Sequence, residues 1–263
     1  MNEDTKFILS TMEWSFSRLK AYNQCPYLFR LKYIDCNEGE ENFFAQYGSF
    51  VHKILEKYAK GELTLFDLCE YYEKHYCENV VCPAPPNRFV DLGQSYYDKG
   101  LDYLENIDLD LENYEILGVE KEVKFKIGKY KMVGFIDLLL KDKKTGDITV
   151  LDHKSRSMKI NKNGEVSKSN QEEFKLFKYQ LYLYSIAIEK EYGVKPKFLK
   201  WNLFKNKEYL TVNFDDKEYE DAKQWVLDTI HDIENDTKWL PNPSDYYCRN
   251  LCDMRNCACE YKP

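Results

Sequence analysis

The stretch GFIDLLLKDKKTGDITVLDHKS, from Gly134 to Ser155, decides the fold. Two apolar, β-prone runs flank a polar segment that contains a glycine, which is typical of a β-hairpin. If this hairpin folds symmetrically about its centre, Asp137 lies directly opposite Asp152, on the same face and about 5 Å away at Cβ. Lys154 follows Asp152 by two residues, so it lies on that face as well.

A second expected hairpin extends this face. It turns at Gly128 and Lys129 and brings Glu120 opposite Asp137. Glu120, Asp137 and Asp152 would then form a row across three antiparallel strands. Carboxylates this close repel each other unless a cation lies between them, so the row predicts a site for a metal ion. The alternative is a set of solvent-facing charges on an open sheet, and a one-residue slip in register would break the row.

These residues resemble the signature of the PD-(D/E)XK nuclease superfamily in its RecB-like form. The signature here is Gly-Phe-Ile-Asp137 followed by Asp152-His-Lys154. Gly48-Ser-Phe-Val-His52 is similar to the helix that supplies a metal-binding histidine in that family. Gln180-Leu-Tyr-Leu-Tyr184 is similar to its Q-x-x-x-Y helix. Each segment alone is weak, but their order along the chain makes the resemblance specific.

The resemblance implies a restriction-endonuclease-like fold of the α/β (α+β) class, in which helices flank a mixed β-sheet. It implies that Mg²⁺ or Mn²⁺ is held by His52, Asp137, Asp152 and the His153 backbone carbonyl. The catalytic residues that it implies are Asp137, Asp152, Lys154, Gln180 and Tyr184, with Glu120 as an additional candidate. Lys154 would orient or deprotonate the attacking water. Gln180 would fix Lys154 or the scissile phosphate, and Tyr184 would support it one turn along the same helix.

The nine cysteines give a further indication, because four of them lie close together near the C-terminus. We expect a reducing cytoplasm, since the chain opens on an acidic segment without an apolar leader, and clustered cysteines there more often hold metal than form disulfides. Ser15 to Tyr27 resembles the entry segment of the iron–sulfur subgroup, which includes the AddB nuclease domain and the CRISPR adaptation nuclease. That resemblance implies a [4Fe–4S] cluster on Cys25, Cys248, Cys252 and Cys257, with Cys259 as a substitute for the last. Four thiolates also suit zinc.

The length of 263 residues predicts one nuclease domain, 1–263. Its expected parts are, approximately, a helical block at 15–115, a catalytic sheet and helix at 116–214, and a C-terminal helix with the iron–sulfur tail at 215–263. Apolar spacing and end signals predict helices over 14–34, 43–60, 65–77, 94–106, 175–192 and 216–235. A further strand pair is expected at 198–204 and 208–214.

The net charge of −7 is unusual for a protein that binds nucleic acid. Local charge matters more than the total, however, because phosphate contacts dominate affinity. A basic segment begins beside the expected site and supplies the candidate DNA-binding residues Arg156, Lys159, Lys162 and Lys168. The alternative for these side chains is ordinary solvated surface charge.

The resemblance therefore implies a metal-dependent DNA nuclease, and we expect an exonuclease that acts on single-stranded DNA or DNA ends. The expected contexts are recombination, repair, phage replication and CRISPR adaptation in the cytoplasm of a bacterial, archaeal or phage-infected cell, away from membranes. A helicase, recombinase or integrase is the expected type of protein partner. Two other classes stay open: a catalytically silent module that binds DNA ends, and a metal-cluster interaction protein whose carboxylates are incidental.

Overall fold

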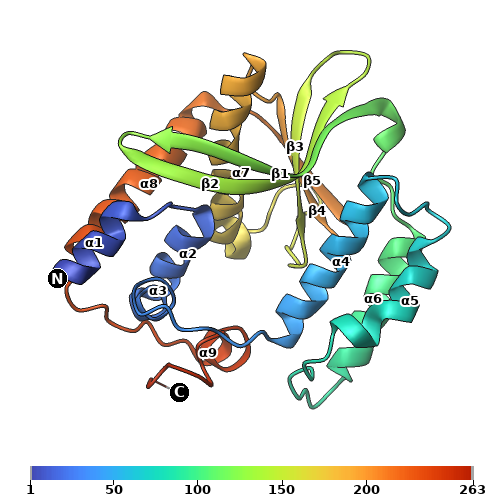
Figure 1. Cartoon of the computed structure of the whole chain (residues 1–263). Coiled ribbons are helices and arrows are strands. Elements are labelled where there is room, and N and C mark those ends of the chain that lie inside the picture. Colours follow the sequence, from blue (N-terminus) through green and yellow to red (C-terminus); the bar gives the residue numbers. More distant parts are fainter. Residues whose placement is uncertain (1, 262–263) are drawn as a thin grey trace. The chain divides into compact units, whose positions relative to one another are not determined.

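A five-stranded sheet organises the chain in the computed structural model, which describes residues 2–261 (Figure 1). The strands lie in the order in which they occur in the sequence, β1-β2-β3-β4-β5. The pairs β2–β3 and β4–β5 are antiparallel whereas β3–β4 is parallel, so the sheet is mixed, as predicted. The strands are β1 (Tyr114–Ile127), β2 (Tyr130–Asp142), β3 (Ile148–Lys154), β4 (Phe198–Leu203) and β5 (Glu208–Asn213).

The hairpin of β2 and β3 has the register that the sequence predicts. Leu138 pairs with Leu151, and three further pairs follow toward the turn. Extended by one position away from the turn, this register sets Asp137 opposite Asp152. At the turn itself, the Asp142 carboxylate accepts hydrogen bonds from the N–H groups of Lys144 and Thr145 at 2.8 Å each, which closes the loop.

The parallel pairing of β3 with β4 requires a crossover connection, and helix α7 (Gln171–Tyr192) provides it. The helix ends at Gly193, whose φ of +73° is a left-handed conformation that glycine adopts without steric cost. Leu181, Tyr182 and Leu183 in its middle are all buried, so the helix is enclosed on several sides. This fixes where Gln180 and Tyr184 lie along the sheet.

The chain divides into two compact units. One unit consists of residues 43–123 and 135–219, and the other of residues up to 42, 124–134 and those from 220 onward. Helices of the first are α4 (Phe43–Ala59), α5 (Leu68–Asn79), α6 (Leu92–Glu105) and α7, with short 3-10 turns at Leu111–Asn113 and Lys168–Asn170. Helices of the second are α1 (Glu3–Thr11), α2 (Phe16–Gln24), α3 (Pro26–Phe29), a π-helix at Arg30–Ile34 and α9 (Asp245–Asn250), while α8 (Asp216–Asn235) belongs to both. The single domain expected from the length stays a prediction.

The predicted helices and strands are present, with small shifts at their ends. The helical stretch expected over 14–34 is divided, because α2 begins after the capping residue Ser15 and α3 starts anew at Pro26. The short helices α1 and α9 are not among the predicted elements. Every helix in the described part of the chain is too short or too polar to serve as a membrane span.

Candidate active site

One face of α4 lines the candidate active site. The other face is buried in an aromatic core through Tyr47, Phe50 and Ile54, whose spacing of three and four residues is that of a helical stripe. Gly48 lies on the side toward Ser155, at the end of β3. A Cβ added to this glycine would lie 3.1 Å from the Ser155 hydroxyl oxygen. Glycine within a helix costs about 1 kcal/mol relative to alanine, and here it allows the close approach.

An open groove runs along this face of α4 and reaches the sheet. Its lining comprises Phe44, Ala45, Gly48, Ser49, His52, Lys53 and Glu56 from α4, together with Glu120 of β1, Asp137 of β2 and Ser155. Within the groove, ligand atoms of His52, Glu120 and Asp137 all lie within 4.8 Å of one another. The His52 Nδ1 is 3.5 Å from Asp137 Oδ2. Two carboxylates and an imidazole at this separation form a donor set that suits a divalent ion.

Glu120 reaches this group through an irregularity in β1. Its φ of +48° lies in the left-handed region, which residues other than glycine seldom adopt. The alternation of buried and exposed side chains in β1 becomes regular only beyond this residue, from Val123 onward. Such local distortions re-aim a side chain and concentrate at functional sites. The strand pattern alone gives no sign of it.

The pKa values of these three side chains decide which of them carry a proton and which can bind a cation. Removal from water, and next the charge of Asp137, raise the pKa of Glu120 to about 7. Burial likewise raises the pKa of Asp137, although Lys154 and the His153 N–H oppose this change. The same removal from water lowers the pKa of His52 to about 4, so its ring is neutral at pH 7. At 30% and 12% exposure, the side chains of His52 and Asp137 are still accessible to an ion.

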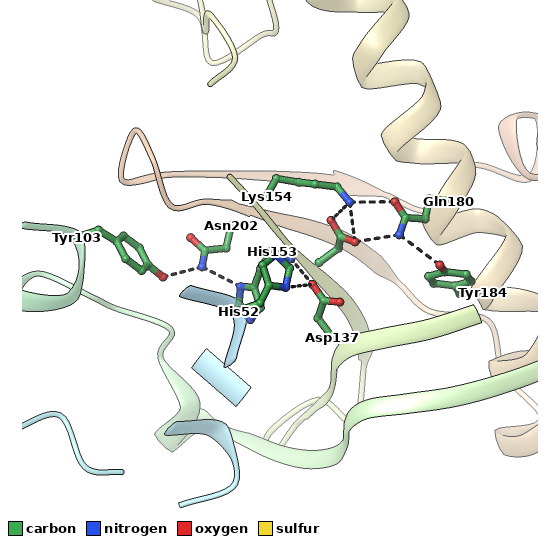
Figure 2. Close-up of polar contacts among 9 residues, drawn as sticks. His52, Tyr103, Asp137, His153, Lys154, Gln180, Tyr184 and Asn202 are labelled. Atoms are coloured by element: carbon green, nitrogen blue, oxygen red, sulfur yellow. Dashed lines mark hydrogen bonds and ion pairs between the residues drawn. The ribbon is translucent and has the colours of Figure 1, made fainter. Parts of the chain in front are cut away.

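A second set of side chains holds Lys154 beside the carboxylates (Figure 2). The Lys154 ammonium lies 2.7 Å from Asp152 Oδ2 and 2.9 Å from Asp152 Oδ1. It also donates to Gln180 Oε1 at 2.9 Å. The amide nitrogen of Gln180 donates to Asp152 Oδ1 at 3.1 Å and to the Tyr184 hydroxyl at 3.2 Å. Gln180 therefore fixes both partners of the ion pair, and Tyr184 fixes Gln180.

Asp152 is the most enclosed of the carboxylates, with 3% of its surface exposed. Burial raises its pKa to about 6, with Lys154 acting in the opposite direction. Within the described residues, its buried Oδ2 receives no hydrogen bond of regular geometry, and its ion pair is with the Lys154 ammonium. That oxygen therefore retains the capacity to bind a further cation.

His153 connects the two sets through its backbone. Its N–H donates to Asp137 Oδ2 at 2.6 Å. Its backbone also forms a hydrogen bond with the His52 ring, and because this bond favours the protonated ring, the ring donates and the His153 carbonyl accepts. The His153 carbonyl thus points toward His52. A histidine that donates one ring N–H to a carbonyl presents its other nitrogen to a metal.

The His153 ring packs against the His52 ring, with 5.6 Å between ring centres, and contacts Asn202 on β4. Its Nδ1 lies 2.9 Å from the side-chain nitrogen of Asn202, which also donates to the Tyr103 hydroxyl at 2.6 Å (Figure 2). The side chains of His153, Asn202 and Tyr103 are buried. Asn202 and Tyr103 were not among the predicted site residues, because nothing in their local sequence connects β4 and α6 to β3.

The basic segment after Lys154 begins at the groove. Arg156 forms an ion pair with Glu173 through its Nε at 3.3 Å. The three lysines of the predicted set, Lys159, Lys162 and Lys168, are exposed. Buried Met158 and Val166 anchor the segment to the protein. Contact of these four basic residues with DNA stays a prediction.

The cysteines near the C-terminus gather around a separate cavity. It is lined by Cys25, Cys248, Cys252 and Cys259, together with apolar and amide side chains. Backbone N–H groups point at two of the sulfurs, from Asn242 to Cys25 at 3.3 Å and from Ser244 to Cys248 at 3.4 Å. Burial raises the pKa of the Cys252 thiol to about 11.

Cys257 lies outside this lining. Its thiol donates to the Asp253 carbonyl and lies 3.8 Å from the Met254 sulfur. No disulfide joins any of the nine cysteines of the described chain. The structure thus gathers Cys259 with Cys25, Cys248 and Cys252.

The family model of the PD-(D/E)XK nuclease superfamily matches residues 13–260. The fold is similar to the crystal structure of a "Putative exonuclease" from Eubacterium rectale, with a TM-score of 0.55 and 13% identity over 100% of this chain and 95% of that one. The crystal structure of SSO0001 matches with a TM-score of 0.35 and 16% identity over 100% of this chain and 98% of that one. The search among curated proteins found no match.

Proposed function

Because the chain belongs to the PD-(D/E)XK nuclease superfamily, we propose that it is a metal-dependent deoxyribonuclease whose active site is the groove along α4. The observation that carries this proposal is the close grouping of His52, Glu120 and Asp137 beside the Asp152–Lys154 ion pair. Nuclease chemistry needs these two components together: oxygen ligands for a divalent ion and a lysine near the reacting water.

The residues present fit Mg²⁺ or Mn²⁺. The ligands would be Glu120, Asp137, the unprotonated nitrogen of His52, Asp152 and the His153 carbonyl. The raised pKa values of the carboxyl groups support this reading, because a bound cation would offset the repulsion between them. When bound, the ion lowers the pKa of a water molecule and offsets charge on the phosphate oxygens.

Lys154 acts on the attacking water. Its Nζ is held in place by Asp152 and by Gln180 Oε1, so it can orient the water or, after losing a proton, accept one from it. Gln180 keeps Asp152 and Lys154 in a fixed relation through one amide group. The Tyr184 hydroxyl accepts from that amide, and burial raises its pKa far above neutrality, so it remains protonated.

We propose that the substrate is single-stranded DNA or a DNA end and that the enzyme is an exonuclease. The open groove, lined by exposed Ala45, Ser49 and Lys53, can receive a strand along α4. The likeness of the fold to the Eubacterium rectale protein, described as a "Putative exonuclease", agrees with this mode of action. Arg156, Lys159, Lys162 and Lys168 would contact the phosphates of the strand.

We further propose that Cys25, Cys248, Cys252 and Cys259 hold a [4Fe–4S] cluster. The support is their common cavity and the N–H groups directed at two of the sulfurs, because such hydrogen bonds stabilise a thiolate ligand. Cys25 is far from the other three in sequence, so the cluster would cross-link a long loop and stabilise the fold. Anaerobic purification followed by iron, sulfide and zinc analysis distinguishes the cluster from a zinc ion.

The nuclease proposal is tested by incubating end-labelled single- and double-stranded DNA with the purified protein and Mg²⁺ or Mn²⁺. Wild type, Asp137→Ala and Lys154→Ala are compared. We expect cleavage by the wild type alone, with a product ladder that gives its polarity. Wild-type protein that binds DNA ends but never cleaves them, with either metal, would instead indicate a catalytically silent end-binding module.

A further inference from the structure

Lys205 is a half-buried cation in the turn between β4 and β5. Its ammonium donates to the Tyr96 hydroxyl and lies 4.2 Å from the centre of the same ring. Within the described part of the chain, no carboxylate lies within ion-pair distance of Lys205. A cation withdrawn from water without a counter-ion is unfavourable unless a ligand supplies negative charge.

The charge of a second cation, Arg156, acts on Lys205 and Tyr96. The Arg156 charge is, after burial, the cause that lowers the pKa of Lys205. It also opposes the rise in the pKa of Tyr96 that burial produces. The guanidinium charge thus acts electrostatically on both side chains. Glu173 supplies one carboxylate for the two cations, so the pair retains positive charge.

This cationic pair adjoins the groove of the candidate active site. Arg156 follows Ser155, which lines the groove opposite Gly48. The Tyr96 ring packs against Phe44, another groove residue, with 5.4 Å between ring centres. Phe44 precedes His52 by eight residues of α4, which is about 12 Å along the helix axis.

We propose that Lys205 and Arg156 form a subsite for a phosphate group of the nucleic acid strand, next to the scissile phosphate. This inference rests on the proposed nuclease function. Arg156 can bind phosphate oxygens through two parallel N–H groups, whereas Lys205 provides a point charge. The stacking of Lys205 on Tyr96 reduces the side-chain entropy lost when a strand binds. This phosphate is either an internal phosphate of the nucleic acid strand or the phosphate at its end.

The test measures binding of a 12-nucleotide oligothymidylate, labelled at an internal base, as salt concentration is varied without divalent ions. The variant is Lys205→Met. Its matched control is Lys207→Met, because Lys207 lies in the same turn but is already paired with Asp102 at 2.7 Å. We expect Lys205→Met to raise Kd about tenfold at low salt and to reduce the slope of log K against log salt by about 0.7, the value for one phosphate contact on a single strand.

Further variants keep the result interpretable. Lys205→Arg should retain the wild-type slope, and Arg156→Met should reduce it as Lys205→Met does. Thermal melting of each variant shows that it is folded. If Lys205→Met weakens the binding only of strands that carry a terminal phosphate, the subsite binds that terminal phosphate. If it weakens the binding of strands with and without a terminal phosphate, the subsite binds an internal phosphate.

An unchanged slope and Kd in folded Lys205→Met and Arg156→Met, in a wild type that binds and cleaves DNA, would overturn the subsite alone. Equal losses in Lys205→Met and Lys207→Met would also overturn it, because they would reflect general surface charge. A wild type that neither binds nor cleaves DNA would overturn the proposed function together with the subsite.

Discussion

The carboxylate site and the cysteine cavity are both assembled from distant parts of the sequence, but the sequence specifies them to different degrees. Asp137, Asp152 and Lys154 stand on paired strands, where counting residues decides which face a side chain occupies. The C-terminal cysteines stand on the short helix α9 and the turns after it, where no period applies. Regular elements therefore allow a site to be located by spacing, whereas an irregular tail does not.

The two regions also differ in how their charge is balanced. Asp152 has its own ammonium partner, and Gln180 holds that pair. Among the described residues, neither Glu120 nor Asp137 forms an ion pair with a lysine or arginine, and burial raises the pKa of both acids. In the cysteine cavity, burial raises the pKa of Cys252. Both regions would gain from a metal, but only in the carboxylate site would the metal also act in chemistry.

The largest expected effect separates these roles. Asp137→Ala should lower cleavage by about a thousandfold, because it removes a proposed metal ligand and the acceptor of the His153 N–H. The melting temperature of the metal-free protein should change little, because removal of a buried carboxylate offsets the loss of the hydrogen bond from the His153 N–H. Single-turnover cleavage and circular dichroism measure the two quantities. Retention of a tenth of the wild-type rate would contradict the proposed role of Asp137.

Substitution of the cysteines in the cavity should lower the melting temperature, which Asp137→Ala should not. Cys25→Ala and Cys259→Ala should abolish visible absorbance and lower the melting temperature by about 10 °C, as expected when a cross-link over a long loop is lost. Cys257→Ala is the matched control and should retain colour and stability. A colourless Cys257→Ala protein beside a coloured Cys259→Ala protein would reverse the assignment of the fourth ligand.

A smaller effect concerns pH. Because the pKa of Glu120 is raised from 4.5 to about 7, the folded state holds that proton more tightly than the unfolded state does. Stability of the metal-free protein should therefore fall as pH rises through this interval, by about 1 kcal/mol after allowance for solvent screening. Mn²⁺ affinity should rise over the same interval, as the proton leaves.

Glu120→Gln isolates that contribution. In this variant the denaturation midpoint should depend less on pH between 5 and about 8, and Mn²⁺ affinity should be lower at all pH values. Urea denaturation and calorimetric titration at several pH values measure both. Wild-type pH dependence that persists unchanged in Glu120→Gln would assign the titration to another group.

The smallest effect is expected at Tyr184. Tyr184→Phe removes the acceptor of one 3.2 Å hydrogen bond from Gln180 and leaves the ring in place. The cost of about 0.5–1 kcal/mol corresponds to a roughly threefold lower rate, with DNA affinity unchanged. Steady-state kinetics separates kcat from KM. A loss as large as that in Lys154→Ala would indicate that the Tyr184 hydroxyl contacts the substrate.

Much of the fold could be predicted because its signals are local. The polar turn between two apolar runs gave the register of β2 and β3, and the ends of β3 and α8 agree with prediction. Two aspects of the site depend instead on tertiary structure. The left-handed Glu120 backbone and the buried Asn202–His153 contact have no signature in a single segment. Lys205 was missed for the same reason, because its partners Tyr96 and Arg156 lie on other elements.

Anomalous diffraction from crystals soaked in Mn²⁺ locates the proposed metal centre directly. We expect a manganese peak within bonding distance of His52, Glu120 and Asp137, with Lys154 still held by Gln180, and loss of the peak in Asp137→Ala. Manganese bound elsewhere, or a peak that persists in Asp137→Ala crystals, would contradict the claim that these three side chains form the metal centre.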